Sequence, residues 1–371
     1  MWERISVLIP YLITAAALTF ALTGVLRRVS IRRGIVAKPR ERDIHTKPTP
    51  RLGGVAMIVS FIVVFAAAQI LSPRILWFTD ELRLGLDRQA LGLMAGMVVL
   101  LLFGIWDDVR SLTPRQQFLG QFLAASCVIA SGIGIDFITN PFGPPGSVIS
   151  LQQVTIPLFP IGTHVATITL WSDLFTLFWL IAVMNTMNWF DGLDGLAGGV
   201  SAIAALLLAV LSVMVGSPVG IIAMLVILFG SLLGFLPWNW FPAKIFMGTA
   251  GSTFLGFVLG AAAIISGGKI ATALLVLGVP VLDALWVIGY RIAHRRPVAQ
   301  ADRSHIHHRL IDAGLSVPLA VLLLYLLAAL FGGMALLYND SAMKLWLAVL
   351  LVVTVGGLSI GAQSVKFRRH G

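Results

Sequence analysis

The stretch NTMNWFDGLDGLAGG, residues 185–199, stands between two apolar runs, FTLFWLIAVM before it and VSAIAALLLAV after it. It brings Asn185, Asn188, Asp191 and Asp194 into ten positions of a chain in which only 11% of residues are charged. Polar side chains at the junction of two apolar helices lie at the mouth of a span rather than inside it. The stretch therefore predicts a helical fold with polar groups gathered at one end of its helices.

The composition is that of a membrane protein. Hydrophobic residues make up 58% of the 371 residues, and the mean hydropathy is +0.94, far above that of a soluble domain. Runs of about 17–25 apolar residues cross a bilayer as helices, because backbone N–H and C=O groups must pair internally there. We expect an all-α polytopic membrane protein with about eleven transmembrane helices in one domain, residues 1–371, with its motifs in 38–315. The expected spans are 5–26, 52–71, 89–106, 115–134, 170–187, 194–214, 218–236, 246–266, 270–290, 317–338 and 343–361.

The basic residues set the expected orientation. Arg4 precedes the first span and four arginines at 27–33 follow it, the reverse of a secretory signal, so this span is expected to be an uncleaved anchor with its N-terminus outside. Alternation from there places 20 of the 26 lysines and arginines inside, with a cytoplasmic C-terminus. The segment 135–169 carries no Lys or Arg, and VTIPLFPIGTHVATITL (154–170) alternates enough to predict a small external β-hairpin.

Charge and cysteine content exclude two classes of function. The net charge of +10 could indicate nucleic-acid binding, but the excess is confined to one membrane face, so we expect anionic lipid headgroups or an anionic substrate and no nucleic acid. Cys127 is the single cysteine. It excludes an intrachain disulfide and a thiolate metal cluster.

Five polar segments fall on the same inside face in this topology. They are 38–51, 107–115, 185–194, 239–252 and 291–309. A structural protein has no reason to confine its acidic pairs and its histidines to one side. Their convergence indicates a functional site.

Two acidic pairs are candidates for chemistry. Asp107 and Asp108 repel each other unless cations or protons neutralise them; the alternative is that they mark a helix end in water. Asp191 and Asp194 are three residues apart and share a face if a helix begins here; alternatively Asp191 is an N-cap and Asp194 favours the helix dipole. Oxygen ligands of this kind suit Mg²⁺, which is held by one or two protein oxygens and substrate phosphates, and the spacing of a calcium loop is absent.

Basic and histidine-bearing segments complete the candidate site. Segments 38–51 and 291–309 offer phosphate partners, although positive-inside topology alone also explains them. In HIHH, the side chains of His305, His307 and His308 suit phosphate or sugar hydrogen bonding with acid–base work; a zinc site is the alternative, without an obvious Cys or carboxylate to complete it. Asp283 lies within an apolar span, as a functional group or as the ion-pair partner of an inside arginine.

Five ordered stretches resemble one enzyme family. HTKPTPRLGG (45–54), GIWDDVRSLTP (104–114), NTMNWFDGLDGL (185–196), NWFPAKIFMGTAGS (239–252) and DRSHIHHRL (302–310) are similar to motifs of the polyprenyl-phosphate N-acetylhexosamine-1-phosphate transferases, glycosyltransferase family 4. HIHHRL after DRS is closer to the branch that primes O-antigen, teichoic acid and other wall polymers than to the MurNAc-pentapeptide branch.

The resemblance implies a reaction and its partners. A UDP-N-acetylhexosamine, UDP-N-acetylglucosamine in this branch, would donate its sugar 1-phosphate to undecaprenyl phosphate, giving a lipid-diphospho-sugar and UMP. The cofactor would be Mg²⁺, or alternatively Mn²⁺. The enzyme would lie among the lipids of the inner (cytoplasmic) membrane with its active site on the cytoplasmic face. Which sugar is used, which polymer is primed and whether a homodimer forms stay open.

The resemblance also implies roles for individual residues. Catalytic roles fall on Asp107, Asp108, Asp191, Asp194, His305, His307 and His308. Metal contacts fall on Asn188, Asp191 and Thr249. Substrate contacts fall on Lys38, Arg42, His45, Lys47, Arg51, Asn239, Phe246, Arg303 and Arg309, with the Asn239 amide and the Phe246 ring matched to uracil.

Thr249 departs from the family pattern. Relatives have Asp here, in MG-D-x-GS, and that Asp is a Mg²⁺ ligand, whereas a Thr hydroxyl is neutral and a poor ligand. A nucleotide- and lipid-binding homologue with weakened catalysis is therefore an alternative. A lipid transporter is a further one, but it would place its polar residues near the bilayer midplane. Ser111, where many members carry a third Asp or a Lys, is a minor departure.

Overall fold

The fold is a bundle of long apolar helices. The computed structural model describes residues 6–37, 48–72, 77–78, 82–83, 86–140, 143–144, 147–161, 164–266, 270–295, 304–338 and 340–370. The helices are α2 (Ile9–Arg33), α3 (Gly53–Leu71), α4 (Arg88–Arg110), α5 (Pro114–Ala130), α6 (Leu170–Phe190), α7 (Leu196–Met214), α8 (Val219–Asn239), α9 (Gly248–Ile265), α10 (Ile270–Val276), α11 (Gly278–Ala293), α12 (Ile306–Asp312), α13 (Val317–Leu337) and α14 (Ser341–His370).

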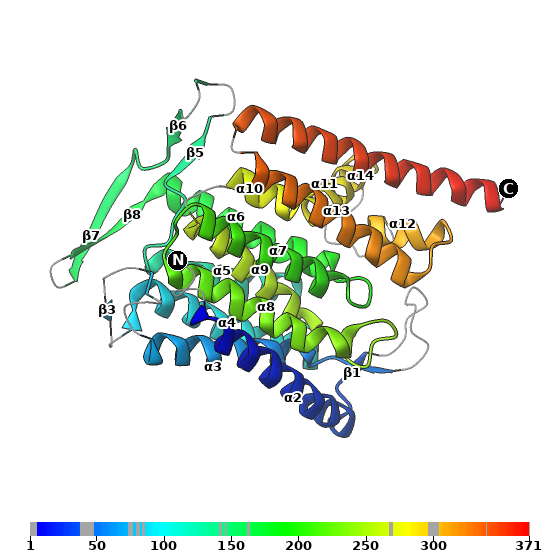
Figure 1. Ribbon diagram of the computed structural model, residues 1–371, viewed down its shortest axis with the longest axis horizontal. Coiled ribbons are helices and arrows are strands. Elements are labelled where there is room, and N and C mark those ends of the chain that lie inside the picture. Colours follow the sequence, from blue (N-terminus) through cyan, green and yellow to red (C-terminus); the bar gives the residue numbers. More distant parts are fainter. Residues whose placement is uncertain are drawn as a thin grey trace.

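Short antiparallel strand pairs lie at the two ends of the bundle. β1 (Val36–Ala37) pairs with β2 (Thr49–Pro50), β3 (Leu82–Arg83) with β4 (Leu86–Asp87), β5 (Phe137–Thr139) with β6 (Val148–Ser150), and β7 (Thr155–Ile161) with β8 (His164–Thr169). The β7–β8 pair is the hairpin predicted from the alternating sequence, and it projects from one end of the bundle. β1 and α12 lie at the opposite end (Figure 1).

Most predicted spans form single helices. Among the described residues, nine helices are long and apolar enough to cross a membrane: α2, α3, α4, α6, α7, α8, α9, α13 and the part Ala342–Gln363 of α14. The helix predicted at 115–134 is α5, whose 17 residues begin with a Thr113–Gln116 capping box. The span predicted at 270–290 is helical but is divided into two helices. The helix is interrupted between α10 and α11. Pro280 explains this, because it has no N–H to donate and its ring crowds the carbonyl four residues earlier.

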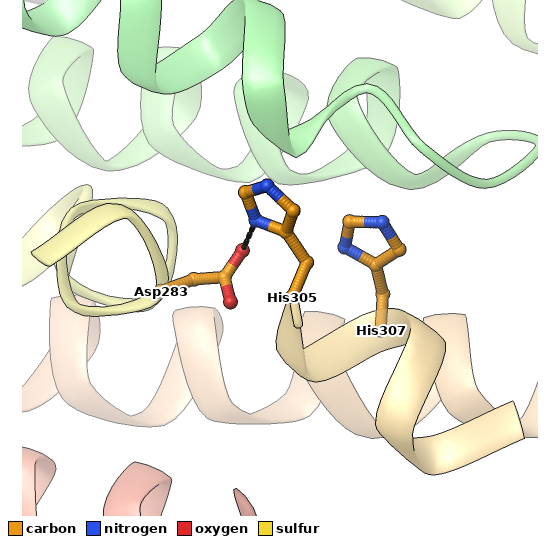
Figure 2. A group of neighbouring side chains, drawn as sticks. All are labelled: Asp283, His305 and His307. Atoms are coloured by element: carbon orange, nitrogen blue, oxygen red, sulfur yellow. Dashed lines mark hydrogen bonds and ion pairs between the residues drawn. The ribbon is translucent and has the colours of Figure 1, made fainter. Parts of the chain in front are cut away.

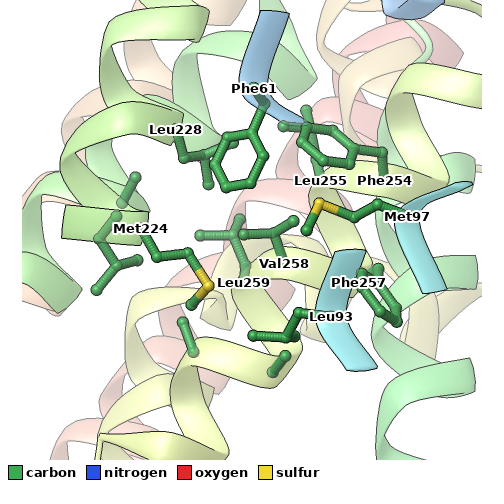
Figure 3. Packing of buried hydrophobic residues seen from close by; sticks show 14 of the residues in the cluster. Phe61, Leu93, Met97, Met224, Leu228, Phe254, Leu255, Phe257, Val258 and Leu259 are labelled. Carbon is green, nitrogen blue, oxygen red and sulfur yellow. The ribbon is translucent and has the colours of Figure 1, made fainter. Parts of the chain in front are cut away.

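Helix α9 occupies the centre of the bundle. It packs against α3, α4, α6, α7 and α8, and its residues from Ala250 to Ile264 are buried. Figure 3 shows the core that forms around it, with side chains contributed by α3, α4 and α8. The labelled residues are Phe61, Leu93, Met97, Met224, Leu228, Phe254, Leu255, Phe257, Val258 and Leu259. Because α9 begins with GTAGS, its buried position carries that polar stretch to the end of the core.

Small residues let α9 approach two neighbours closely. A Cβ on Gly54 of α3 would collide with the backbone of Gly251, and a Cβ on Gly104 of α4 would collide with Ala250. Backbone hydrogen bonds continue the α3 contact, since Gly54 N donates to Met247 O at 2.8 Å and Gly53 N to Phe246 O at 3.0 Å. These contacts fix the position of α9 along its axis, so that its first turn lies beside the end of α4.

We predict that Gly54→Ala destabilises the protein by about 1–3 kcal/mol, because the new methyl group has to displace the α9 backbone. The measurement is thermal unfolding in detergent. Gly333→Ala on α13 is the matched control, since a Cβ there meets nothing within 4 Å, and it is expected to be neutral or to stabilise by up to about 1 kcal/mol. Equal unfolding temperatures for the two variants would contradict the close-packing argument.

Candidate functional site

The predicted polar segments meet at one end of the bundle, so far as the structure describes them. The end of α4 contacts the start of α9 through Asp108 and Thr249. The loop between α6 and α7 contacts the α8–α9 loop through Asp194 and Ala243. This end is the one that carries β1 and α12 (Figure 1). Residues separated by more than a hundred positions are thereby brought into one site.

The two carboxylates of the Asp107–Asp108 pair have different partners. Asp107 Oδ1 accepts hydrogen bonds from Leu112 N at 2.6 Å and Gln117 Nε2 at 3.1 Å, and so closes the turn from α4 to α5. Asp108 Oδ1 accepts from Thr249 N at 3.0 Å. Both side chains are buried, which excludes the alternative of two carboxylates that mark a helix end in water. Asp107 shapes a turn, and Asp108 faces α9.

Gly248 makes room for the Asp108 carboxylate. Its φ is +71°, a left-handed conformation that favours glycine. A Cβ there would collide with the Asp108 carboxylate and with the carbonyl oxygen of Arg51. The first N–H groups of α9 are therefore directed at a protein carboxylate.

Asp191 and Asp194 lie in a loop. Helix α6 ends at Phe190 and α7 begins at Leu196, so the predictions that the pair shares a helix face and that Asp191 is an N-cap are wrong. The left-handed φ of Gly195, +77°, separates the loop from α7. Asp194 Oδ2 accepts from Ala243 N at 2.8 Å and is thereby held against the α8–α9 loop.

Asn239 and Tyr325 hold the same loop in place. The Asn239 amide oxygen accepts from Gly195 N at 3.0 Å, and its nitrogen donates to Ile245 O at 3.1 Å. The Tyr325 hydroxyl donates to Gly195 O. The amide group of Asn239 is buried and already bonds backbone groups on two sides. Uracil binding by Asn239 stays a prediction.

Asp191 is the carboxylate of the loop that remains available. In the described part of the chain it accepts no hydrogen bond from a backbone N–H, unlike Asp107, Asp108 and Asp194. Burial raises the pKa of Asp191 from 3.8 to about 7, with further raising by the charges of Asp194 and Asp108 and partial lowering by Arg51. The group therefore exchanges a proton, or binds a cation in its place, near neutral pH.

The histidines form a cluster beside Asp283 of α11 (Figure 2). His305 Nδ1 donates to Asp283 Oδ2 at 2.7 Å, and Ile306 N donates to Asp283 Oδ1 at 2.7 Å. Asp283 thus bonds a histidine, whereas the sequence had offered an inside arginine as its partner. Asp283, His305 and His307 each offer one ligand atom within 4.8 Å of the others, which supplies the carboxylate that the zinc alternative lacked.

His307 connects this cluster to the acidic loop. Its ring packs edge-on against Phe190 at 6.1 Å between ring centroids, and a Cβ on Gly192 would collide with its Nε2 atom. Burial lowers the pKa of His307 well below 6.5, and His308 and His305 lower it further. His307 is consequently a neutral imidazole at pH 7.

Other predicted site residues have partners within the protein. Asn188 Oδ1 accepts from the Ser252 hydroxyl at 2.8 Å. The backbone N–H of Phe246 donates to Pro50 O at 2.7 Å. Arg309 donates from Nε to Ser304 O at 2.7 Å and its guanidinium lies 5.4 Å from the Trp286 ring. The predicted contacts Lys38, Arg42, His45, Lys47 and Arg303 lie outside the described residues.

The donor set fits a hard divalent cation between α4 and the α6–α7 loop. Asp108 Oδ2 is buried and has no hydrogen-bond partner among the residues that the structure describes. Asp191 lies close enough to Asp108 for the Asp108 charge to raise the pKa of Asp191. An unpartnered buried carboxylate oxygen is costly unless a proton or a cation is bound there. Asp108 and Asp191 are thus the pair that could hold Mg²⁺, with Thr249 bonded to Asp108 through its backbone.

Three residues of the site were not predicted from the sequence. Tyr325, a lone hydroxyl within the apolar run of α13, could have been noticed for that reason. Gln117 lies in the first turn of α5 and Gln121 one turn further along. Gln121 exchanges amide hydrogen bonds of 2.7 and 3.3 Å with Asn185. With Asp107, Thr249 and Thr253, the two glutamines line a small cavity beside the site.

The geometry defines a multi-pass membrane protein whose acidic and histidine-bearing loops meet at one end of its helices. The family model of glycosyl transferase family 4 matches residues 90–267. A decaprenyl-phosphate N-acetylglucosaminephosphotransferase of Mycolicibacterium smegmatis is 34% identical, over 92% of this chain and 86% of the relative. The chain therefore belongs to glycosyl transferase family 4, as its motifs predicted, and it is a membrane transferase.

Two further relatives show the range of the similarity. A Bacillus subtilis protein described as a probable undecaprenyl-phosphate N-acetylglucosaminyl 1-phosphate transferase is 29% identical, over 95% of this chain and 91% of its own length. A phospho-N-acetylmuramoyl-pentapeptide-transferase of Staphylococcus epidermidis is 28% identical, over 80% of this chain and 88% of its own length.

We predict that the unfolding temperature falls as the pH rises from 5 to 7.5 in a metal chelator. A carboxyl whose pKa is higher in the folded than in the unfolded state binds its proton more tightly when folded, so its contribution is lost as the pH rises toward the folded value near 7. Asp191→Asn should flatten this dependence, and Mg²⁺ at pH 8 should stabilise the wild type more than this variant. Asp340→Asn, at an exposed carboxylate of the α14 start, is the control expected to behave as wild type.

Proposed function

We propose that the protein transfers N-acetylglucosamine-1-phosphate from UDP-N-acetylglucosamine to undecaprenyl phosphate. The products are lipid-diphospho-N-acetylglucosamine and UMP, in the first membrane step of a cell-envelope polysaccharide, at the cytoplasmic face of the inner membrane. The observation that carries the proposal is the meeting of Asp108, Asp191 and the histidine cluster at one end of an apolar bundle. The names of the relatives support N-acetylglucosamine as the sugar and a polyprenyl phosphate as the acceptor.

The reaction is a substitution at phosphorus. An oxygen of the lipid phosphate attacks the β-phosphorus of the donor, and the bond from that phosphorus to the oxygen bridging toward the α-phosphate breaks, releasing UMP. A phosphate monoester has a second pKa of about 6, so the acceptor is mostly a dianion at pH 7. A strong general base is therefore not required, and positioning of two anionic groups is the main task.

The protein groups divide this task. Mg²⁺, or alternatively Mn²⁺, held by Asp108 and Asp191, would supply neutralisation of the diphosphate charge. Asp107 holds the α4–α5 turn, and Asp194 holds the acidic loop against α8–α9. Arg51 adds positive charge beside Asp191. The histidines supply hydrogen bonds to the diphosphate or the sugar, with His307 entering as a neutral group.

The proposal predicts metal-dependent transfer by the purified protein. With radiolabelled UDP-N-acetylglucosamine, undecaprenyl phosphate and Mg²⁺, label should enter the lipid fraction, and a chelator should abolish this. Asp108→Asn keeps an acceptor for Thr249 N but loses its charge, so kcat should fall by about a hundredfold or more. Asp340→Asn should retain full activity. Lipid product formed equally well without metal or by Asp108→Asn would refute the assigned site, and competition by UDP-N-acetylgalactosamine and UDP-MurNAc-pentapeptide measures the choice of sugar.

A second candidate function is binding of nucleotide and lipid with weak turnover. Thr249 favours it, because this residue lines the cavity beside Asp107 and offers a neutral hydroxyl at the position where the family motif MG-D-x-GS has Asp. UDP-N-acetylglucosamine binding without lipid product would support this candidate. A transporter is disfavoured, because the described polar groups gather at one end of the helices.

We predict that Thr249→Asp increases the affinity of the site for Mg²⁺. A third carboxylate beside Asp108 should lower the Mg²⁺ concentration for half-maximal rate by about tenfold, since ligand charge raises the affinity of a hard cation site. Thr249→Asn, which has a similar shape without charge, should leave that concentration unchanged. The measurement is the initial rate against Mg²⁺ concentration. An unaltered Mg²⁺ requirement in Thr249→Asp would show that position 249 lies outside the metal site.

A further inference from the structure

Asp283 is a buried carboxylate whose two oxygens are both committed. It lies on α11 and is 2% exposed. Oδ2 accepts from His305 Nδ1 and Oδ1 accepts from Ile306 N, each at 2.7 Å. An ionised carboxylate only accepts hydrogen bonds, so the Nδ1 atom of His305 carries the proton of this contact.

The two bonds act on the position and on the chemistry of His305. The bond to Ile306 N attaches the start of α12 to α11, where the helix has no side-chain cap of its own. The bond to Nδ1 selects one tautomer of the neutral ring, with Nε2 as the bare nitrogen. Figure 2 shows this second nitrogen on the side of the ring that faces away from Asp283.

His305 in turn lies beside the acidic loop. Its ring stacks on that of His307, with 5.4 Å between centroids and 16° between planes. His307 packs directly on Gly192, next to Asp191. A rotation or a tautomer change at His305 would therefore alter the group presented beside the candidate site. Asp283 lies behind His305 and reaches the candidate site only through this histidine.

We propose that Asp283 is a positioning residue, which fixes the orientation and the tautomer of His305 so that the bare Nε2 atom accepts a hydrogen bond from a hydroxyl group of the donor sugar. This rests on the proposed transferase function. Asp283 touches no substrate in this arrangement and acts through His305.

The same side chains could instead bind a transition metal. The Nδ1–Oδ2 separation of 2.7 Å is the length of a charge-assisted hydrogen bond, and the second carboxylate oxygen is used by Ile306 N. Both observations favour the hydrogen-bonded arrangement, and zinc binding is an outcome of the experiment.

Asp283→Asn tests the tautomer with little change of shape. The amide oxygen can keep the bond from Ile306 N, but the amide NH₂ that replaces Oδ2 is a donor. His305 Nδ1 then has to accept, which moves its proton to Nε2. We expect kcat to fall by about ten- to a hundredfold, with the KM for UDP-N-acetylglucosamine and the unfolding temperature nearly unchanged. Wild-type kcat in a folded Asp283→Asn protein would overturn the proposal.

His305→Asn is the companion variant. Its amide nitrogen can replace Nδ1 as the donor to Asp283, while no atom replaces Nε2, so the fold should persist and the activity should be lost. In the double variant, Asp283→Asn should cause no further loss, because residues that act through one another are not additive. Independent, multiplied losses would show that Asp283 has only a structural role.

Two measurements separate this proposal from the proposed function. In protein labelled with ¹⁵N-histidine, the His305 signals, identified by their absence from His305→Asn, should change from the Nδ1–H to the Nε2–H pattern in Asp283→Asn, whether or not the wild type makes lipid product. An unchanged pattern would overturn the proposal. In calorimetric titration with zinc chloride, one zinc per wild-type protein and none for Asp283→Asn would also overturn it, in favour of a metal triad.

Discussion

The arrangement of the site depends on one constraint: a carboxylate buried at the end of an apolar helix bundle needs a partner. Asp107, Asp108, Asp194 and Asp283 each meet this constraint by accepting a backbone N–H from a different segment. Because an ionised acceptor in a poorly solvated place strengthens such bonds, each carboxylate ties one loop or helix start to the bundle. The bonds of Asp108, Asp194 and Asp283 join segments that are 141, 49 and 23 positions apart in the chain, whereas the bond of Asp107 closes a local turn.

The carboxylate oxygens left over are the ones available for chemistry. In the described part of the chain, Asp191 accepts no backbone N–H, and Asp108 keeps Oδ2 without a partner. The raised pKa of Asp191 has the same origin, because its buried carboxylate charge is not compensated and a proton can neutralise that charge. The hydrogen bonds thus distinguish the carboxylates that hold segments together from Asp191 and Asp108 Oδ2, and a cation bound between these two groups would relieve the cost of burying them.

Much of the fold could be predicted from the sequence, and so could the meeting of the described polar segments at one end of the bundle. Long apolar runs, the alternation at 154–170 and the motif order predicted the helices, the hairpin and the family. The prediction failed at 270–290, where Pro280 divides the helix, and at Asp191, where Gly195 keeps the pair out of α7. In both places a single local residue outweighed the pattern of its neighbours, because proline and glycine alter the backbone itself.

The sequence by itself determined that this is a membrane protein of glycosyl transferase family 4 with acidic, amide and histidine groups on its interhelical segments. Only the tertiary structure decided which of them are held by hydrogen bonds within the protein and which keep a buried oxygen without a partner among the described residues. Asp107 and Asp108 are adjacent in the chain, yet one closes a turn and the other reaches α9, 141 residues away. The partner of Asp283 is likewise 22 residues distant. Such partners depend on how the close packing of helices places the end of one helix beside the start of another. The periodicity of residues along the chain contains no information on this packing.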